Sequence, residues 1–227
     1  MKVAKKTAKK PVPKKCPHIG RGEETRRMIL DAALKVFAAH PYNAASIRMI
    51  ATQGGFYHGL IRYHFPNKAI IFKTVVEEVS QNLLKANKEW LSEISTLSPR
   101  KALVVYMDRM IDFFQTQPEA LRIFAQNISH DDPSSLPGYS HMLDYVIRSQ
   151  KEFENTFKLL PSDMVRRFST AFNVLAVNYL GADKFYAEIQ GLVPQSDEYL
   201  RWVKKTMISI FSPLIKEMMP IDGRILQ

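Results

Sequence analysis

The chain has 227 residues, of which 46% are hydrophobic and 24% are charged, and its formal net charge is +10 at pH 7. This length can bury a sizeable core in one or two domains. No apolar run approaches the roughly 18 residues of a membrane span, and the start lacks the apolar stretch of a signal peptide, so we expect neither feature. The single cysteine, Cys16, excludes an internal disulfide and a cysteine-based metal cluster and favours a reducing cytoplasm.

The positive charge is concentrated near the N-terminus. Residues 1–22 carry eight Lys and Arg and no acid, and residues 23–72 carry six basic and three acidic groups. The rest of the chain has 18 basic and 19 acidic groups. This asymmetry indicates a nucleic-acid-binding end. Residues 1–22 also contain prolines among the lysines, so we expect a disordered arm that follows DNA phosphates or enters the minor groove. The alternative is a solubilising tail.

The first predicted helix follows Glu23-Glu24 and runs to about Ala39, and Pro41 ends it. The segment from Ser46 to Lys68 then predicts two short helices joined by a tight turn. Ser46 can cap the first of them, and Gly54-Gly55 allows the sharp reversal after it. The second begins near Tyr57. This organisation is typical of a helix-turn-helix, whose second helix enters the DNA major groove.

The remaining sequence predicts helices and no strand of useful length. One apolar stripe from Lys68 to about Ser95 indicates a helix that would span about 40 Å. Further helices are predicted over residues 98–116, 118–129, 139–159, 163–190 and 196–218, with a loop at 130–138. Gly181 is a possible weak point in the helix over 163–190. The sequence therefore predicts an all-α protein of about nine helices.

The stretch from about Thr25 to Val79 resembles the DNA-binding domain of the TetR (tetracycline-repressor-type) family of bacterial regulators. The matching pieces are Ile29–Leu34 with Phe37, Tyr42–Arg48 with Ile50-Ala51, Gly55, His58–Ile61 and Tyr63–Lys68. Three residues depart from the family pattern: Pro41 replaces a frequent glycine, Tyr57 the usual serine and Arg62 a frequent tyrosine. Because the last two lie on the predicted recognition helix, we expect an unusual target sequence.

The resemblance implies which residues contact DNA. Tyr57, His58 and Leu60 are expected at base edges, and Gly59 would permit close approach of the backbone. The residues expected at phosphates are Ser46, Arg48, Tyr63, His64 and Lys68. Arg62 is expected to join either group.

Methionine and aromatic residues are abundant between residues 100 and 190, which is typical of an adaptable apolar core. The resemblance implies a cavity there for an apolar effector, although a place in the packed core is the favoured interpretation for any one of these residues. The candidate pocket residues are Met107, Met110, Phe114, Phe124, Tyr145 and Phe172.

The last two predicted helices carry bulky groups on more than one face. The resemblance implies a two-fold dimer sealed by these helices from each chain. The candidate interface residues are Phe168, Phe172, Tyr199, Trp202 and Phe211.

The predicted organisation is a basic arm (1–22), a helix-turn-helix domain (23–72) and an effector-binding and dimerisation domain (73–227). The predicted function is a homodimeric, ligand-responsive transcriptional regulator that binds a palindromic operator in the bacterial cytoplasm, with repression expected over activation. The alternative is a helical carrier of an apolar molecule, tethered by its basic arm.

An enzyme is the least favoured class. The sequence has no glycine-rich phosphate loop, no paired-cysteine motif and no HExxH motif, so we expect no catalytic residue, metal or cofactor. His130, Asp131 and Asp132 could ligate a metal with His141, but a plain polar loop is the favoured interpretation.

Overall fold

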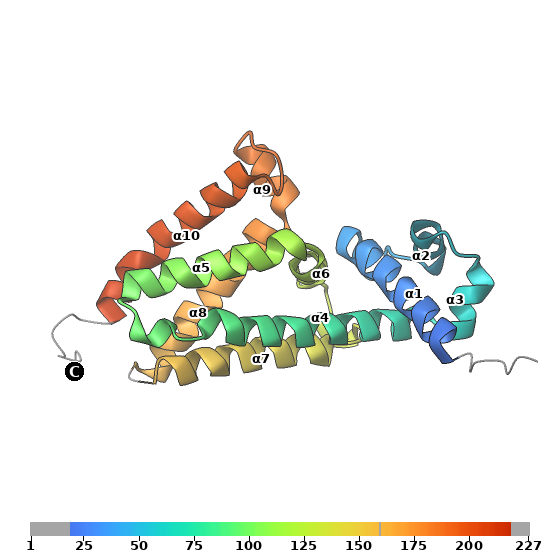
Figure 1. The fold of residues 1–227 in the computed structure, drawn as a ribbon, viewed down its shortest axis with the longest axis horizontal. Coiled ribbons are helices and arrows are strands. Elements are labelled where there is room, and N and C mark those ends of the chain that lie inside the picture. The colour runs from blue at the N-terminus through green and yellow to red at the C-terminus, as the bar shows by residue number, and fades with distance from the viewer. Residues whose placement is uncertain (1–18, 159, 219–227) are drawn as a thin grey trace, which may run out of the picture.

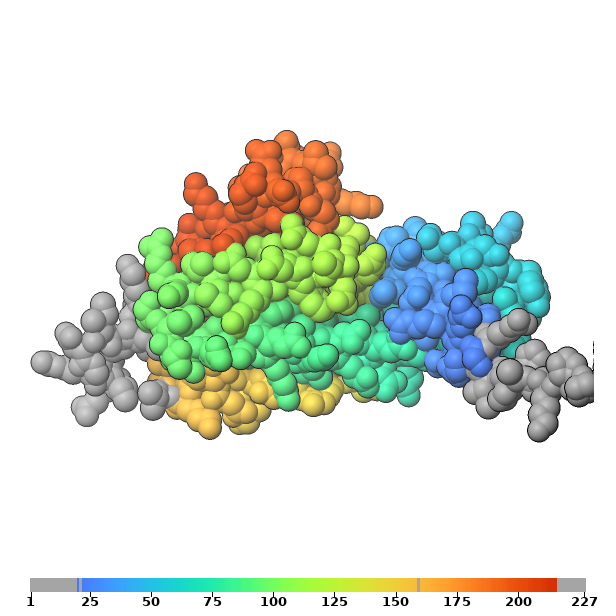
Figure 2. Space-filling view, viewed as in Figure 1, coloured from blue at the N-terminus to red at the C-terminus, as the bar shows by residue number. Residues whose placement is uncertain are grey.

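The computed structural model describes residues 19–158 and 160–218, which form ten α-helices and no strand. Three helices make a lobe at one end of the molecule, and the others form a larger helical domain (Figures 1 and 2). The lobe contains α1 (Ile19–Ala39), α2 (Ile47–Gly54) and α3 (His58–His64). The larger domain contains α4 (Lys68–Leu91), α5 (Pro99–Thr116), α6 (Glu119–Asn127), α7 (Tyr139–Thr156), α8 (Ser162–Ala176), α9 (Asp183–Ile189) and α10 (Asp197–Met218). The all-α prediction is confirmed.

Helix α4 connects the lobe to the larger domain. It begins where Asn67 Oδ1 accepts a hydrogen bond from the Ile70 N–H at 3.0 Å. Its 24 residues span about 36 Å and pack against α5 and α7 (Figure 1). The helix is shorter than predicted because Glu93 adopts a left-handed conformation, with φ of 63°, and a 3-10 turn follows at Ile94–Thr96. The predicted domain boundary at residues 72 and 73 falls inside α4, so the two domains share this helix.

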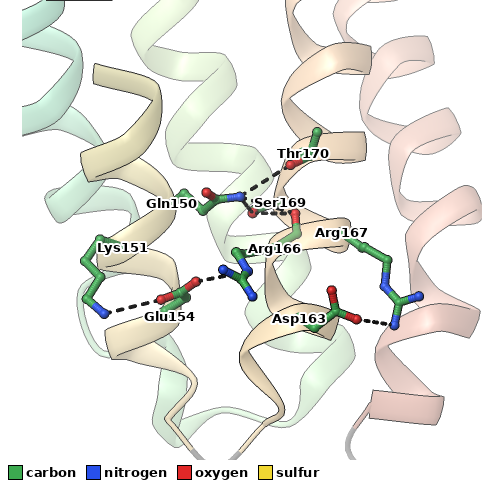
Figure 3. Close-up of polar contacts among 8 residues, drawn as sticks. All are labelled: Gln150, Lys151, Glu154, Asp163, Arg166, Arg167, Ser169 and Thr170. Carbon is green, nitrogen blue, oxygen red and sulfur yellow. Dashed lines mark hydrogen bonds and ion pairs between the residues drawn. The ribbon is translucent and has the colours of Figure 1, made fainter. Parts of the chain in front are cut away.

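Polar side chains join helices α7 and α8 (Figure 3). The Gln150 side-chain amide lies 3.4 Å from the hydroxyl oxygens of Ser169 and Thr170. The Glu154 carboxylate of α7 lies 3.9 Å from Nε of Arg166 on α8. The aromatic side chains of the same helices point inward, where Phe153 and Phe168 have ring centroids 5.7 Å apart.

The prediction of a single helix over residues 163–190 is wrong, because the helix is interrupted near Gly181. Helix α8 ends at Ala176, continues as a π-helical turn over Val177–Gly181, and is followed by α9. The break lies against α6: a Cβ atom on Gly181 would be 2.7 Å from the Leu121 carbonyl oxygen. Directly after it, the buried Asp183 carboxylate pairs with Arg122 of α6 at 2.7 Å. This close approach and ion pair account for ten helices in place of about nine.

The predicted basic arm mostly lies outside the described residues. Helix α1 begins at Ile19, so it includes the last four residues of that predicted segment. None of the described helices is both long and apolar enough to cross a bilayer.

The packing of Gly181 against α6 predicts a stability effect. We expect Gly181→Ala to lower the free energy of unfolding by about 1–3 kcal/mol, because the added methyl group overlaps the Leu121 carbonyl and the Ala125 side chain. Gly22→Ala is the matched control, since nothing lies within 4 Å of a Cβ at this helical position. It should be neutral or stabilising by up to about 1 kcal/mol. Urea unfolding followed by far-ultraviolet circular dichroism measures both, and equal effects would contradict the packing argument.

Candidate nucleic-acid interface

Two glycines shape the turn between α2 and α3, one by its backbone conformation and the other by its lack of a side chain. Gly55 has φ of 70°, the left-handed conformation that ends α2. Gly54 provides space, because a Cβ there would be 2.0 Å from the ring of Phe56. At the other end of α2, the Ser46 hydroxyl accepts a hydrogen bond from the Met49 N–H at 3.3 Å. The predicted cap and reversal are therefore confirmed.

Helix α3 has a buried inner face and an open outer face. Ile61 is fully buried and anchors the helix, and Phe65 closes its C-terminal end beneath the guanidinium of Arg26, 5.0 Å from the ring centroid. On the outside, Tyr57 is 71% and Tyr63 is 85% exposed. The exposed residues of α3 and its N-cap are Tyr57, His58, Gly59, Arg62 and Tyr63, and Leu60 and His64 are half-buried. The structure thus brings the predicted recognition residues together on one short element.

Gly59 has a local role that the sequence did not indicate. A Cβ atom at this position would be 3.0 Å from the Tyr57 ring. The missing side chain therefore leaves room for the Tyr57 ring over the first turn of α3.

The start of α2 offers a second polar surface. Arg48 is exposed there, and a hollow between α1 and α2 is lined by Lys35, His40, Ser46 and Arg48 among others. Lys35 and His40 were not among the predicted contacts, because on sequence alone they belong to the preceding helix and its end. Together these groups form a basic edge suited to phosphate oxygens.

Lys68 is largely engaged within the protein. Its ammonium group donates hydrogen bonds to the carbonyl oxygens of Tyr42 and Ala45 at 2.8 and 2.9 Å, and lies 4.2 Å from the Tyr42 ring centroid. Burial lowers the pKa of Lys68. Two of its three N–H donors thus hold the turn before α2, and one remains for a phosphate.

The same turn is held from the larger domain. The Tyr42 N–H donates to Oδ1 of Asn127, at the end of α6, at 3.0 Å. Asn127 is 1% exposed, and its Nδ2 donates to the Ile123 carbonyl at 2.8 Å. Beside it, Asn43 Nδ2 lies 2.9 Å from His130 Nε2, at hydrogen-bond distance. No local sequence signal points to these contacts, because the partners are more than 80 positions apart.

His130 is a structural contact in the loop that was weighed as a metal site. Its Nδ1 lies 2.9 Å from the Asp132 carbonyl oxygen, and its Nε2 faces Asn43. Among residues 19–158 and 160–218, no three His, Cys, Asp or Glu side chains are gathered closely enough to hold a metal ion.

An apolar cavity, here called the distal cavity, lies at the end of the larger domain that is remote from α3. Its walls come from the turn after α4 and from α5, α7, α8 and α10. The lining residues are Ile94, Leu97, Pro99, Ala102, Leu103, Tyr106, Phe153, Phe157, Leu160, Phe168, Phe172 and Ile215.

Of the six predicted pocket residues, only Phe172 lines the distal cavity. The other five, Met107, Met110, Phe114, Phe124 and Tyr145, are buried core residues. Helical periodicity marks these side chains as inward-facing but does not separate a packed neighbour from a cavity wall.

The predicted interface residues need a correction. Phe168, Phe172, Tyr199 and Phe211 are all buried within a single chain. Phe168 and Phe172 lie 5.0 and 5.2 Å from the Phe211 ring centroid. The three phenylalanines join α8 to α10 inside one chain, and all four side chains are too deeply buried to contact a partner. Trp202 is partly exposed and stacks on Tyr199.

Comparison with known proteins agrees with the geometry of the lobe. Residues 29–75 match the family described as bacterial regulatory proteins of the tetR family. A stretch of 54 residues is 39% identical to the HTH-type transcriptional regulator SrpR of Pseudomonas putida. That match covers 24% of this chain and only 25% of SrpR.

Solved structures match most of the chain. A TetR-family regulator of Streptomyces coelicolor has a TM-score of 0.55 at 16% identity, over 88% of this chain and 92% of that chain. NalD of Pseudomonas aeruginosa has a TM-score of 0.57 at 19% identity, over 88% and 99%. FadR of Bacillus subtilis, solved with stearoyl-CoA, has a TM-score of 0.58 at 14% identity, over 83% and 97%. At these identities, the likeness shows the fold alone.

The match of residues 29–75 identifies the helix-turn-helix region as tetR-type, and the shared arrangement of the helices shows that the whole chain has the fold of the solved TetR-family regulators.

Proposed function

We propose that this protein is a ligand-responsive transcriptional regulator, acting as a repressor, that binds a palindromic DNA operator as a homodimer. The observation that carries the proposal is the open outer face of α3. Aromatic and basic side chains stand exposed on a short helix whose inner face is anchored by Ile61. An exposed helix on a rigid support is the element that such proteins place in the major groove.

The order of residues along α3 supports a division between base and phosphate contacts. The N-terminal residues of a recognition helix reach base edges, which favours Tyr57 and His58 as readers. Arg62 lies one turn further on the same exposed face, and its guanidinium can form two hydrogen bonds to guanine. Tyr63, the most exposed large side chain of the helix, and Arg48 are placed for phosphates.

Two structural neighbours support repression and control by a small molecule. NalD is described as the secondary repressor of a multidrug efflux pump. FadR was solved in complex with stearoyl-CoA. By analogy of fold, we propose that the larger domain of this chain binds an effector that alters the position of the α1–α3 lobe.

The proposed dimer uses the outer faces of α8 and α10. With their buried aromatic groups assigned to the core, these helices still present exposed apolar side chains: Val174 on α8, and Ile210 and Leu214 on α10. Burying them between two copies would gain hydrophobic free energy. A two-fold axis there would let two α3 helices reach successive major grooves, about 34–36 Å apart.

Selection of preferred duplexes from a random-sequence pool, at about 150 mM salt, tests the function. We expect an inverted repeat from the natural protein. Arg62→Ala should relax the preference at one position of each half-site, by about 1–3 kcal/mol, because it removes a base contact. Arg148→Ala, an exposed arginine of α7, is the control and should return the unchanged motif. Binding without any sequence preference would favour the alternative carrier with a basic arm.

Sedimentation analysis of a double variant tests the dimer. Val174→Asp with Ile210→Asp should convert the protein to monomers that keep their helical content, because two carboxylates would lose hydration at the interface. Ile147→Asp introduces a charge at a comparably exposed residue of α7 and should leave the dimer intact. A double variant that remains dimeric would move the interface elsewhere.

A further inference from the structure

We infer that the effector is a neutral, mostly apolar molecule with one hydrogen-bond acceptor, and that the acceptor is read by the buried pair Tyr106 and Asn87 beside the distal cavity. This inference rests on the proposed function, because it takes the chain to be ligand-responsive. It adds the chemical class of the ligand and the residues that select it.

The lining of the distal cavity excludes a charged ligand head within it. All twelve lining residues are apolar or aromatic, and the only polar side-chain group among them is the hydroxyl of Tyr106. A carboxylate or phosphate would lose its hydration there without gaining a cationic partner. A neutral ligand loses much less hydration and gains contact with the aromatic walls formed by Phe153, Phe168 and Phe172.

The polar end of the site is the pair formed by Tyr106 on α5 and Asn87 on α4. The Tyr106 hydroxyl donates a hydrogen bond to Asn87 Oδ1 at 3.2 Å. Asn87 is 3% exposed, and its Nδ2 group has no hydrogen-bond partner. Burial also raises the pKa of Tyr106, so its hydroxyl stays protonated and neutral. The pair therefore offers free N–H donors inside an apolar region, and a carbonyl or ether oxygen is their natural partner.

The small size of the cavity indicates where the ligand must go. Its volume of about 40 Å³ has room for only a few water molecules, so an organic ligand has to displace part of the wall. Displacement of the Tyr106 ring opens the cavity toward Asn87, and there the ligand satisfies an unpartnered group.

Asn87 also connects the site to the DNA-binding lobe. It belongs to α4, the helix whose first residue, Lys68, holds the turn before α2. A second buried group without a partner, the Ser80 hydroxyl, lies two turns earlier on the same side of α4. A ligand bonded to Asn87 would therefore act directly on the helix shared by both domains.

Three single-ring probes separate acceptor, apolar and charged chemistry: acetophenone, ethylbenzene and benzoate. Calorimetric titration of the full-length protein should show acetophenone binding about tenfold more tightly than ethylbenzene, as one added hydrogen bond implies. Benzoate should not bind measurably. Asn87→Leu combined with Tyr106→Phe removes both donors of the pair at similar side-chain size, and should keep the affinity for ethylbenzene and abolish the preference for acetophenone. Tyr145→Phe changes a buried tyrosine that does not line the cavity and should leave the preference intact.

Equal affinity for acetophenone and ethylbenzene, tighter binding of benzoate, or no binding of any probe would overturn the inference. So would a preference for acetophenone that survives in the double variant of Asn87 and Tyr106. Because the titration contains no DNA, its outcome is independent of operator recognition. If duplex selection showed no sequence preference, the proposed regulator function would be refuted, but a positive titration would still support the ligand site.

Discussion

The position of the DNA-binding lobe depends on how the backbone of Tyr42 is held. Its N–H donates to Asn127 of α6, and its C=O accepts from Lys68 of α4. Its ring lies 4.8 Å from that of Phe72 on α4. Tyr42 lies in the turn that precedes the helix-turn-helix. Both of its main-chain groups therefore bond to residues of α4 and α6, outside the α1–α3 lobe. Release of the first bond would leave the Oδ1 of buried Asn127 unpaired, which is costly, so α2 and α3 are expected to follow α6 when this helix moves.

Helix α6 lies between this turn and the proposed dimer helices. At one end Asn127 bonds to Tyr42, and near the other Arg122 pairs with Asp183 of α9. Directly before Arg122, the Leu121 carbonyl packs against Gly181 in the π-helical turn that follows α8. Helix α8 also supplies Phe168 and Phe172 to the distal cavity. A change in the cavity wall therefore has two physical routes to the lobe, one through α4 and one through α8 and α6.

Local chemistry made much of this fold predictable from sequence. The cap at Ser46 and the reversal at Gly55 each depend on neighbouring residues, and each lies where predicted. Helix α5 begins at Pro99, one residue after the predicted start at residue 98. The exposed face of α3 was also predictable, because the motif that carries it is contiguous.

Features that depend on distant partners were not predictable. The helix is interrupted at Gly181 because α6 approaches the backbone there. The hydrogen bond between Tyr42 and Asn127 joins residues 85 positions apart. The division of the aromatic residues into core, cavity wall and exposed surface failed for a related reason. Periodicity identifies the buried side of a helix, but the neighbouring helices decide what that side meets, as Phe168 and Tyr145 show.

Amide hydrogen exchange at Tyr42 tests the central claim, that α6 holds the turn before the helix-turn-helix. In full-length protein, Asn127→Ala should speed exchange of the Tyr42 amide by about tenfold or more, because its acceptor is removed. The Ile70 amide, bonded to Asn67 in the same region, reports general destabilisation and should be unaffected. Unchanged protection of Tyr42, or equal acceleration at both amides, would contradict this account.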